Sequence, residues 1–136
     1  MKTILLIVLL QVVFLANSAD AEIESIHIVI NKSIDHYNNR QFIDSLAELE
    51  TIKNSRNEHT NWYYYYAINQ TRLKNYDEAM SNFETYIKNS SEENTAKAYY
   101  YIGLIQFYKG EYEKALNSLE LSMDVSSDPK LDNMIE

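Results

Sequence analysis

The feature that most constrains the fold is an internal repeat. Residues 63–83 (YYYYAINQTRLKNYDEAMSNF) and 99–119 (YYYIGLIQFYKGEYEKALNSL) align without a gap, and a weaker copy lies upstream at 37–49 (YNNRQFIDSLAEL). The same position in the three copies is held by Ser45, Ala79 and Ala115, at spacings of 34 and 36 residues. A period of this length is typical of proteins in which small helical or mixed units stack and bury a continuous core between them.

Each copy is predicted to hold two helices joined by a tight turn. The chain has only two glycines and one proline, so long irregular connections are not expected. The second half of each copy begins with an aromatic residue and continues with apolar residues at helical spacing: Phe42, Leu46, Leu49 and Ile52; Tyr76, Ala79, Met80, Phe83 and Ile87; Tyr112, Ala115, Leu116, Leu119 and Met123. These patterns predict an all-α fold.

Small residues are predicted where the two helices of a copy cross. The pairs are Ser33 with Ser45, Ala67 with Ala79, and Gly103 with Ala115. Glycine inside a helix costs about 1 kcal/mol relative to alanine. Gly103 therefore indicates a close approach of two helices, which a larger side chain would prevent. Gly110 falls between the two predicted helices of its copy, where a left-handed residue can end a helix.

These positions resemble the tetratricopeptide repeat, a unit of about 34 residues with the pattern W-x2-L-G-x2-Y…A-x3-F…P. The chain departs from the pattern at His36, Gln70 and Gln106, where the family has tyrosine, and no copy has the closing proline in register. The matching residues are Phe42, Ser45 and Leu49 in the first copy; Tyr63, Tyr66, Ala67, Tyr76, Ala79 and Phe83 in the second; Tyr99, Ile102, Gly103, Gly110, Tyr112, Ala115 and Leu119 in the third.

The resemblance implies an α-solenoid of about three antiparallel helix-turn-helix repeats, at about 26–57, 60–91 and 96–127. The first helices of such repeats line a concave surface on which this family holds extended peptides or helices of a partner protein. This register predicts a binding strip at Ile34, Tyr37, Tyr64, Ile68, Tyr100, Leu104, Phe107 and Tyr108, joined by Ile30 and Thr71. The alternative is that a small, tightly curved array packs these residues on one another.

Four consecutive tyrosines occupy residues 63–66, and on a helix they point about 100° apart. They cannot all be core residues. The family register implies that Tyr63 and Tyr66 face the interior and that Tyr65 is the most exposed. The third copy repeats the arrangement, so Tyr101 is expected to point outward. Tyrosine suits a binding surface, because it offers a large rigid contact area with one polar tip.

The N-terminus has the pattern of a secretory signal. Lys2 precedes an apolar run at 4–16 (ILLIVLLQVVFLA), and the small residues Ala19 and Ala21 resemble an A-x-A cleavage site. The run is shorter than the ~20 apolar residues of a comfortable membrane span. We therefore expect residues 1–21 to be cleaved, leaving 22–136 as an exported domain, periplasmic or secreted. The alternative is an uncleaved membrane anchor formed by the apolar run.

The C-terminal residues are expected to cap the array. Asp128 and Pro129 suit the N-cap and first position of a helix, and Leu131, Met134 and Ile135 would then share one apolar face. Solenoid ends need a cover over the last apolar helix. We expect a short helix at 128–136 to lie over 112–123; the alternative is a frayed terminus.

Composition and motifs exclude most other classes of function. A net charge of −8 with scattered basic residues disfavours nucleic acid as a partner. No catalytic arrangement and no phosphate-binding loop is present, and none of the three histidines has metal-site spacing; His36 is expected to fill an interior slot. We expect no enzyme activity, cofactor, metal or small-molecule substrate. The predicted function is an adaptor that holds a segment of another protein; the alternative is a structural module that self-associates, for example as a homodimer.

Overall fold

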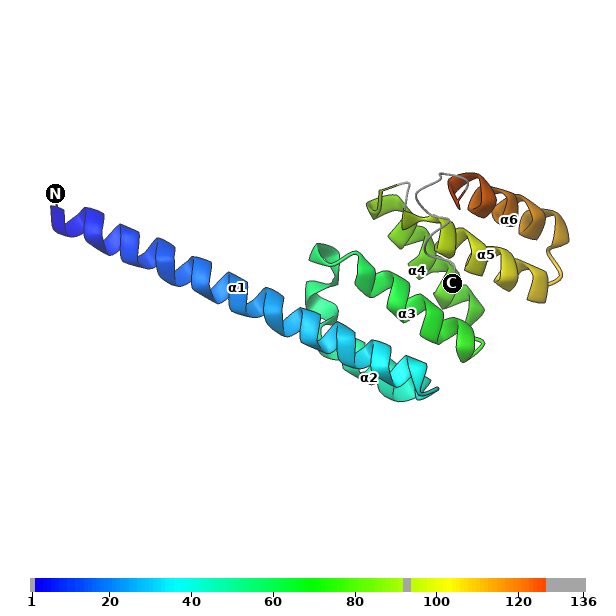
Figure 1. The fold of residues 1–136 in the computed structure, drawn as a ribbon, viewed down its shortest axis with the longest axis horizontal. Helices are drawn as coiled ribbons and strands as arrows, with labels where there is room; N and C mark the ends of the chain where they lie inside the picture. Colours follow the sequence, from blue (N-terminus) through cyan, green and yellow to red (C-terminus); the bar gives the residue numbers. More distant parts are fainter. Residues whose placement is uncertain (1, 92–93, 127–136) are drawn as a thin grey trace.

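The computed structural model describes residues 2–91 and 94–126, and every regular element in those ranges is helical (Figure 1). The predicted all-α class is confirmed for this part of the chain. The elements are α1 (Lys2–Asn38), α2 (Phe42–Thr51), the 3₁₀-helix η1 (Lys53–Glu58), α3 (Asn61–Arg72), α4 (Tyr76–Asn89), α5 (Ala96–Tyr108) and α6 (Tyr112–Ser126). The second helices α2, α4 and α6 begin at the aromatic residues that the sequence pattern marked.

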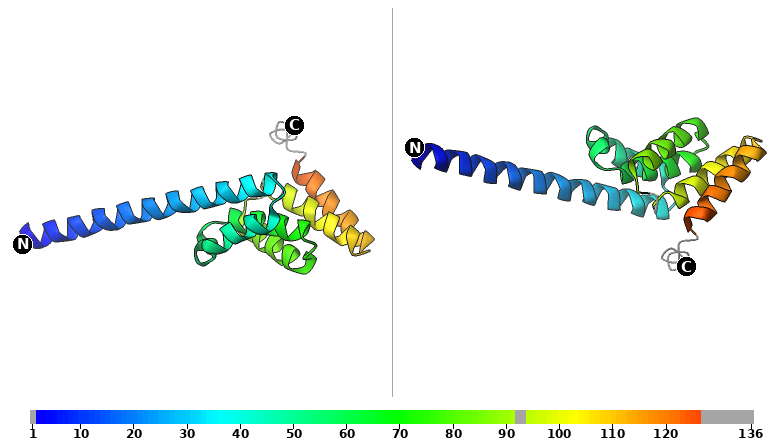
Figure 2. Two further views of the ribbon diagram at one scale, coloured as in Figure 1. Left: turned by 90° about the horizontal axis from the view of Figure 1, so that it is seen from below. Right: turned by 90° about the horizontal axis from the view of Figure 1, so that it is seen from above.

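The six α-helices pack in neighbouring pairs. The closest pairs are α1 with α2, α3 with α4, and α5 with α6, so each pair is a helical hairpin. Consecutive hairpins touch through α2 with α3 and through α4 with α5. The first helices also contact one another, α1 with α3 and α3 with α5, and thus form one side of the packed body (Figures 1 and 2).

The three hairpin turns share one backbone geometry. Arg40, Lys74 and Gly110 hold corresponding places and have positive φ angles of 61°, 64° and 79°. The next residue in each turn donates its amide to a carbonyl five residues back: Gln41 to His36 at 2.9 Å, Asn75 to Gln70 at 2.9 Å, and Glu111 to Gln106 at 2.8 Å. A left-handed residue followed by such a bond is the usual way of ending an α-helix. The turn predicted from Gly110 thus recurs at the two positions that lack glycine.

The predicted small-residue crossings are also present. A Cβ added at Gly103 would lie 2.8 Å from Leu119 Cγ and 3.2 Å from the carbonyl oxygen of Ala115, closer than a normal contact. Glycine is therefore required for the approach of α5 to α6. Ala67 and Ala79 are completely buried in the middle hairpin.

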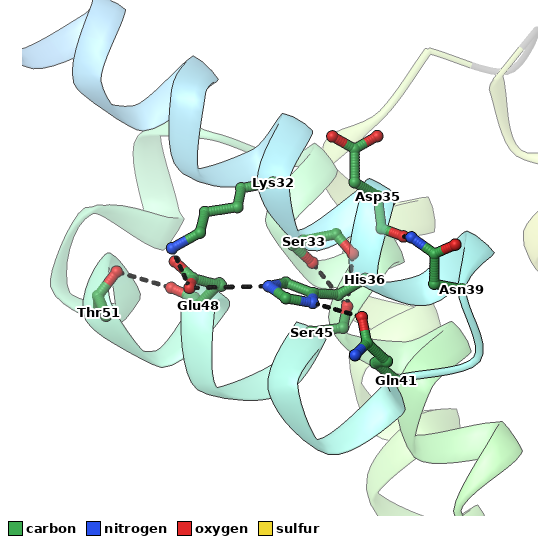
Figure 3. A network of polar contacts seen from close by, with 9 residues as sticks. All are labelled: Lys32, Ser33, Asp35, His36, Asn39, Gln41, Ser45, Glu48 and Thr51. Atoms are coloured by element: carbon green, nitrogen blue, oxygen red, sulfur yellow. Dashed lines mark hydrogen bonds and ion pairs between the residues drawn. The ribbon is translucent and has the colours of Figure 1, made fainter.

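In the first hairpin the crossing is polar (Figure 3). Ser45 Oγ donates to the carbonyl oxygen of Ser33 at 2.8 Å, and the two hydroxyl oxygens are also 2.8 Å apart. Both residues are fully buried, so these bonds satisfy hydroxyls that water cannot reach. At the edge of the same crossing, Lys32 pairs with Glu48 at 2.5 Å, and His36 Nδ1 bonds Gln41 Oε1 at 3.0 Å. His36, expected in an interior slot, is instead half-exposed at this edge of the crossing.

Aromatic residues hold consecutive hairpins together. Trp62 of α3 donates its indole N–H to the carbonyl oxygen of Leu49 at the end of α2, at 2.8 Å. Tyr101 of α5 stacks on Phe83 of α4, with ring centroids 5.5 Å apart and planes 8° from parallel. Trp62, Leu49 and Phe83 are 2% exposed or less. The core therefore lies between successive hairpins as well as within each one.

The N-terminal half of α1 extends away from this body (Figures 1 and 2). Every side chain described between positions 11 and 25 is exposed, and burial begins at Ile26, which is 2% exposed. The helix runs without a break through residues 19–21, where cleavage is predicted. Burial thus starts where the first repeat was expected to start. The predicted cap at 128–136 lies outside the described residues.

Candidate functional site: the aromatic strip on the first helices

The strip predicted on the first helices, defined by Ile34, Tyr37, Tyr64, Ile68, Tyr100, Leu104, Phe107 and Tyr108, divides into two parts. Its members on α1 and α3 are buried or half-buried, because these two helices contact each other. Ile68 is 4% exposed, and Ile34, Tyr37 and Tyr64 pack against the core. The neighbouring Ile30 is buried as well. In this part of the strip the side chains pack on one another, as the alternative interpretation of the sequence foresaw.

Tyr64 is the clearest case of packing. Its ring lies 6.0 Å from Phe83 and 5.3 Å from Tyr86 on α4, and 6.4 Å from Tyr101 on α5, measured between ring centroids. Burial raises the pKa of its hydroxyl above the ordinary value for tyrosine, and the neighbouring phenols add to this effect. Tyr64 therefore joins three helices and has a structural role.

Tyr37 of α1 and Arg72 of α3 contact each other at the edge of the strip. Arg72 Nε donates to the Tyr37 hydroxyl at 3.0 Å, and the guanidinium carbon lies 5.8 Å from the centre of the same ring. Tyr37 also contacts Phe42 at 5.5 Å between ring centroids. The hydrogen bond to Tyr37 raises the pKa of Arg72, a side chain that is charged at any ordinary pH.

The part of the strip on α5 is open to solvent. Tyr100, Phe107 and Tyr108 are 47%, 56% and 64% exposed, while Leu104 is half-buried. The rings of Phe107 and Tyr108 touch at a centroid distance of 6.1 Å, and Tyr108 stacks on Tyr76 of α4 at the same distance. We call Tyr100, Phe107 and Tyr108 the open strip. Large exposed apolar side chains that lie together are the surface feature most often associated with partner binding.

Two expectations for the tyrosine runs need revision. Tyr101, expected to point outward, is half-buried and stacked on Phe83, and burial together with the neighbouring Tyr37 phenol raises its pKa to about 12. Tyr65 is only half-exposed, like Tyr64. The prediction for Tyr101 was wrong because the preceding hairpin supplies a ring for it to stack on. Tyr63 and Tyr66 are buried as predicted.

The structure adds a recess that sequence reasoning missed. A cavity of about 350 Å³ lies beside the strip, between α1 and the start of α3. The rings of His27 and His59 meet at its edge, with centroids 6.4 Å apart. The lining residues are His27, Ile30, Asn31, Ile34, His59, Thr60, Asn61 and Tyr65. The two histidines are 32 residues apart in sequence, so only the packing of α1 on α3 brings them together.

Residues 2–91 and 94–126 contain no group of three or more His, Asp or Glu side chains placed to hold a metal ion. In the same ranges no helix is both long and apolar enough to cross a membrane. The candidate surface for recognition is the open strip.

No protein-family model matches the chain, and no curated protein matches it either.

Proposed function

We propose that the protein is a small array of tetratricopeptide-like repeats that holds a segment of another protein on the open strip. The observation that carries this proposal is the exposure of Tyr100, Phe107 and Tyr108 on one helix whose other faces are packed. Support for a repeat array comes from the three hairpin turns. Each has a residue with a positive φ angle, and the next residue donates its amide to the carbonyl five residues back. A solenoid of this kind is non-enzymatic and presents its first helices to the ligand.

The open strip suits a peptide or helix with apolar side chains. Rigid aromatic rings lose little side-chain entropy on binding, and their hydroxyls can bond the backbone of a bound segment. Arg72 and Lys109 lie at the border of this surface, and Lys109 is already paired with Asp77 at 2.6 Å. Recognition would therefore depend on the rings more than on charge.

We further propose that the domain acts after export, periplasmic or secreted. The described side chains between positions 11 and 25 are exposed, so removal of residues 1–21 takes none of them from the core. N-terminal sequencing of the exported protein tests this: a start near residue 22 is expected, whereas Met1 at the N-terminus would argue for an uncleaved anchor.

The test of the adaptor function is affinity capture from the envelope or secreted fraction of the source. The variant is the triple change Tyr100→Ala, Phe107→Ala and Tyr108→Ala, which should keep the wild-type circular dichroism and lose the captured partner. Ile43→Ala is a matched control, because Ile43 is 72% exposed but lies on α2, away from the strip. Capture that is equal for the wild type and the triple variant would refute the open strip as the binding surface.

A self-associating module is the second candidate, and light scattering separates the two. The exposure of apolar residues on both α5 and α6 is the observation that keeps it in view. A monomer that still captures a partner favours the adaptor. A tight dimer that dissociates on changing Tyr100, Phe107 and Tyr108 to alanine favours self-association.

A further inference from the structure

Two histidines from different hairpins meet at the recess between α1 and the start of α3. His27 lies on α1 and is exposed, whereas His59 lies just before α3 and is half-buried. Their ring centroids are 6.4 Å apart, and the ring planes are inclined by 72°. Neither imidazole makes a hydrogen bond or an ion pair with any described residue. Both rings therefore keep nitrogen atoms that are available to a ligand.

The third histidine of the chain has different surroundings (Figure 3). His36 Nδ1 is bonded to Gln41 Oε1 at 3.0 Å, and its Nε2 lies 4.0 Å from a carboxylate oxygen of Glu48. Both nitrogens of His36 thus face polar partners within the first hairpin. His27 and His59 instead face each other across two hairpins, so polar contacts within one hairpin do not account for them.

The lining of the recess decides which class of ligand suits these nitrogens. Besides the two imidazoles it contains two asparagine amides and the hydroxyls of Thr60 and Tyr65, and no described aspartate or glutamate lines it. The chain has no cysteine. Ca²⁺ and Mg²⁺ prefer sites built from carboxylate and carbonyl oxygens, whereas imidazole nitrogen suits Zn²⁺, Ni²⁺ and Cu²⁺. A divalent transition-metal ion is therefore the ligand class that fits this recess.

The separation of the two rings is close to what one such ion requires. A metal–nitrogen bond of about 2 Å places the centres of two imidazoles about 5 Å apart around one tetrahedral ion. Closing the present 6.4 Å to this value needs only a small rotation of His27, whose side chain is exposed. Asn31 lies one helical turn after His27 on the same face of α1 and also lines the recess, where its amide oxygen is a third donor.

We propose that His27 and His59 bind one divalent transition-metal ion, Zn²⁺ or Cu²⁺, and so join the first hairpin to the second. A closed structural zinc site has four protein ligands. Two imidazoles and one amide oxygen leave positions for water, so the bound ion exchanges with the solvent. Burial of α1 begins at Ile26, and the ion therefore fixes the point at which this helix joins the packed body. The site is separate from the open strip and does not depend on the proposed partner binding.

The test is a metal titration of the untagged full chain, because a histidine tag binds the same ions. A Zn²⁺ concentration roughly 100-fold above Kd should raise Tm by about 5–10 °C, since the two imidazoles come together only in the folded chain. EDTA should reverse the shift, and Mg²⁺ should produce none. Isothermal titration calorimetry should give a single bound ion per chain, with Cu²⁺ bound more tightly than Zn²⁺.

Histidine variants identify the ligands, and the third histidine supplies the matched control. His27→Gln and His59→Gln should each weaken Zn²⁺ binding by about 100-fold or more, because the loss of an outer-shell partner alone costs roughly 10–100-fold. His36→Gln should leave Zn²⁺ binding unchanged, since His36 is bonded within its own hairpin. Circular dichroism checks that each variant is folded. His27 is exposed, so His27→Gln keeps the test readable if the half-buried His59 cannot be replaced.

Three results would overturn the site. The absence of both a Tm shift and a heat of binding with millimolar Zn²⁺ and Cu²⁺ means that the recess holds no metal ion. Undiminished binding in His27→Gln or in His59→Gln means that no ion joins the two hairpins. An equal loss of binding in His36→Gln places the ion away from the recess.

Discussion

The middle hairpin, α3 with α4, and the last hairpin, α5 with α6, carry closely similar sequences in different surroundings. Ile87 is half-buried and Met123, its counterpart, is 69% exposed; Phe83 is fully buried and Leu119 is half-buried. Tyr64 is packed among three helices, whereas Tyr100 is 47% exposed. Residue type alone does not explain these differences, because the register positions match and the side chains are similar.

The difference is set by what lies next to each hairpin. The middle hairpin has α1 and α2 on one side and α5 on the other. Among the described residues, the main contacts of the last hairpin with the rest of the array are those of α5 with α4 and with α3. An aromatic side chain in this kind of fold is therefore structural where a neighbour covers it and available for recognition where none does. The repeat pattern of the sequence defines the register, and the position along the array decides the role.

The largest expected effect comes from shortening the side chain at the same register position in both hairpins. Phe83→Ala should cost about 3–5 kcal/mol of the free energy of unfolding, because it opens a cavity beside Tyr101 and Tyr64. Leu119→Ala should cost clearly less, because its side chain is half-buried. Urea-induced unfolding followed by circular dichroism measures both.

Phe83→Leu keeps the test informative if the alanine variant does not fold. It should lie between the wild type and Phe83→Ala in its midpoint of unfolding. Equal losses for Phe83→Ala and Leu119→Ala would contradict the idea that neighbouring hairpins set the burial of this register position.

A smaller effect is expected from a polar residue that the middle hairpin buries. Asn69 is fully buried; its amide nitrogen donates to the carbonyl oxygen of Tyr65 at 2.8 Å, but its Oδ1 has no hydrogen-bond partner among the described residues. Ile105 holds the same register position in the last hairpin and is also fully buried. An unsatisfied buried carbonyl costs about 1–3 kcal/mol. Asn69→Leu should therefore stabilise the protein by about 1–2 kcal/mol.

The reverse exchange in the last hairpin is the matched control. Ile105→Asn should destabilise the protein, because it buries an amide where the methyl groups were packed. Chemical denaturation of both variants gives the signs directly. A destabilised Asn69→Leu would mean that Asn69 Oδ1 has a partner, such as an ordered water, that the leucine displaces.

Much of the fold could be predicted from local pattern, because the relevant interactions lie within one hairpin. The crossings at Ser33 with Ser45 and at Gly103 with Ala115 could be predicted from side-chain size and spacing, although the hydrogen bonds of the serine pair could not. The starts of the second helices at Phe42, Tyr76 and Tyr112 follow from the same local signal. The resemblance to tetratricopeptide repeats stays a prediction, which the shared turn geometry supports.

The candidate site could be predicted only in part, because exposure depends on contacts between hairpins. The strip residues on α1 and α3 were placed on the right helices, but the sequence could not say that Tyr64 would be enclosed by Tyr86 and Tyr101. The outward direction expected for Tyr101 failed for the same reason. The recess beside His27 and His59 needed the packing of α1 on α3, for which no pattern in the sequence gave a signal.

The smallest expected effect concerns the turns, where the last hairpin has the more favourable residue and the middle hairpin the strained one. The middle hairpin turns at Lys74 with φ of 64°, and the last turns at Gly110 with φ of 79°. A side chain in this left-handed region is strained, whereas glycine is not. Lys74→Gly should therefore stabilise the protein by about 0.5 kcal/mol, since relief of strain slightly exceeds the entropy that glycine adds to the unfolded chain. Gly110→Ala should cost about 1 kcal/mol for the opposite reason.

Glu84→Gly, inside α4, is the control and should cost about 1 kcal/mol. If Lys74→Gly costs as much as Glu84→Gly, the lysine contributes packing that outweighs its strain, and the two turns differ in more than their residue at this position.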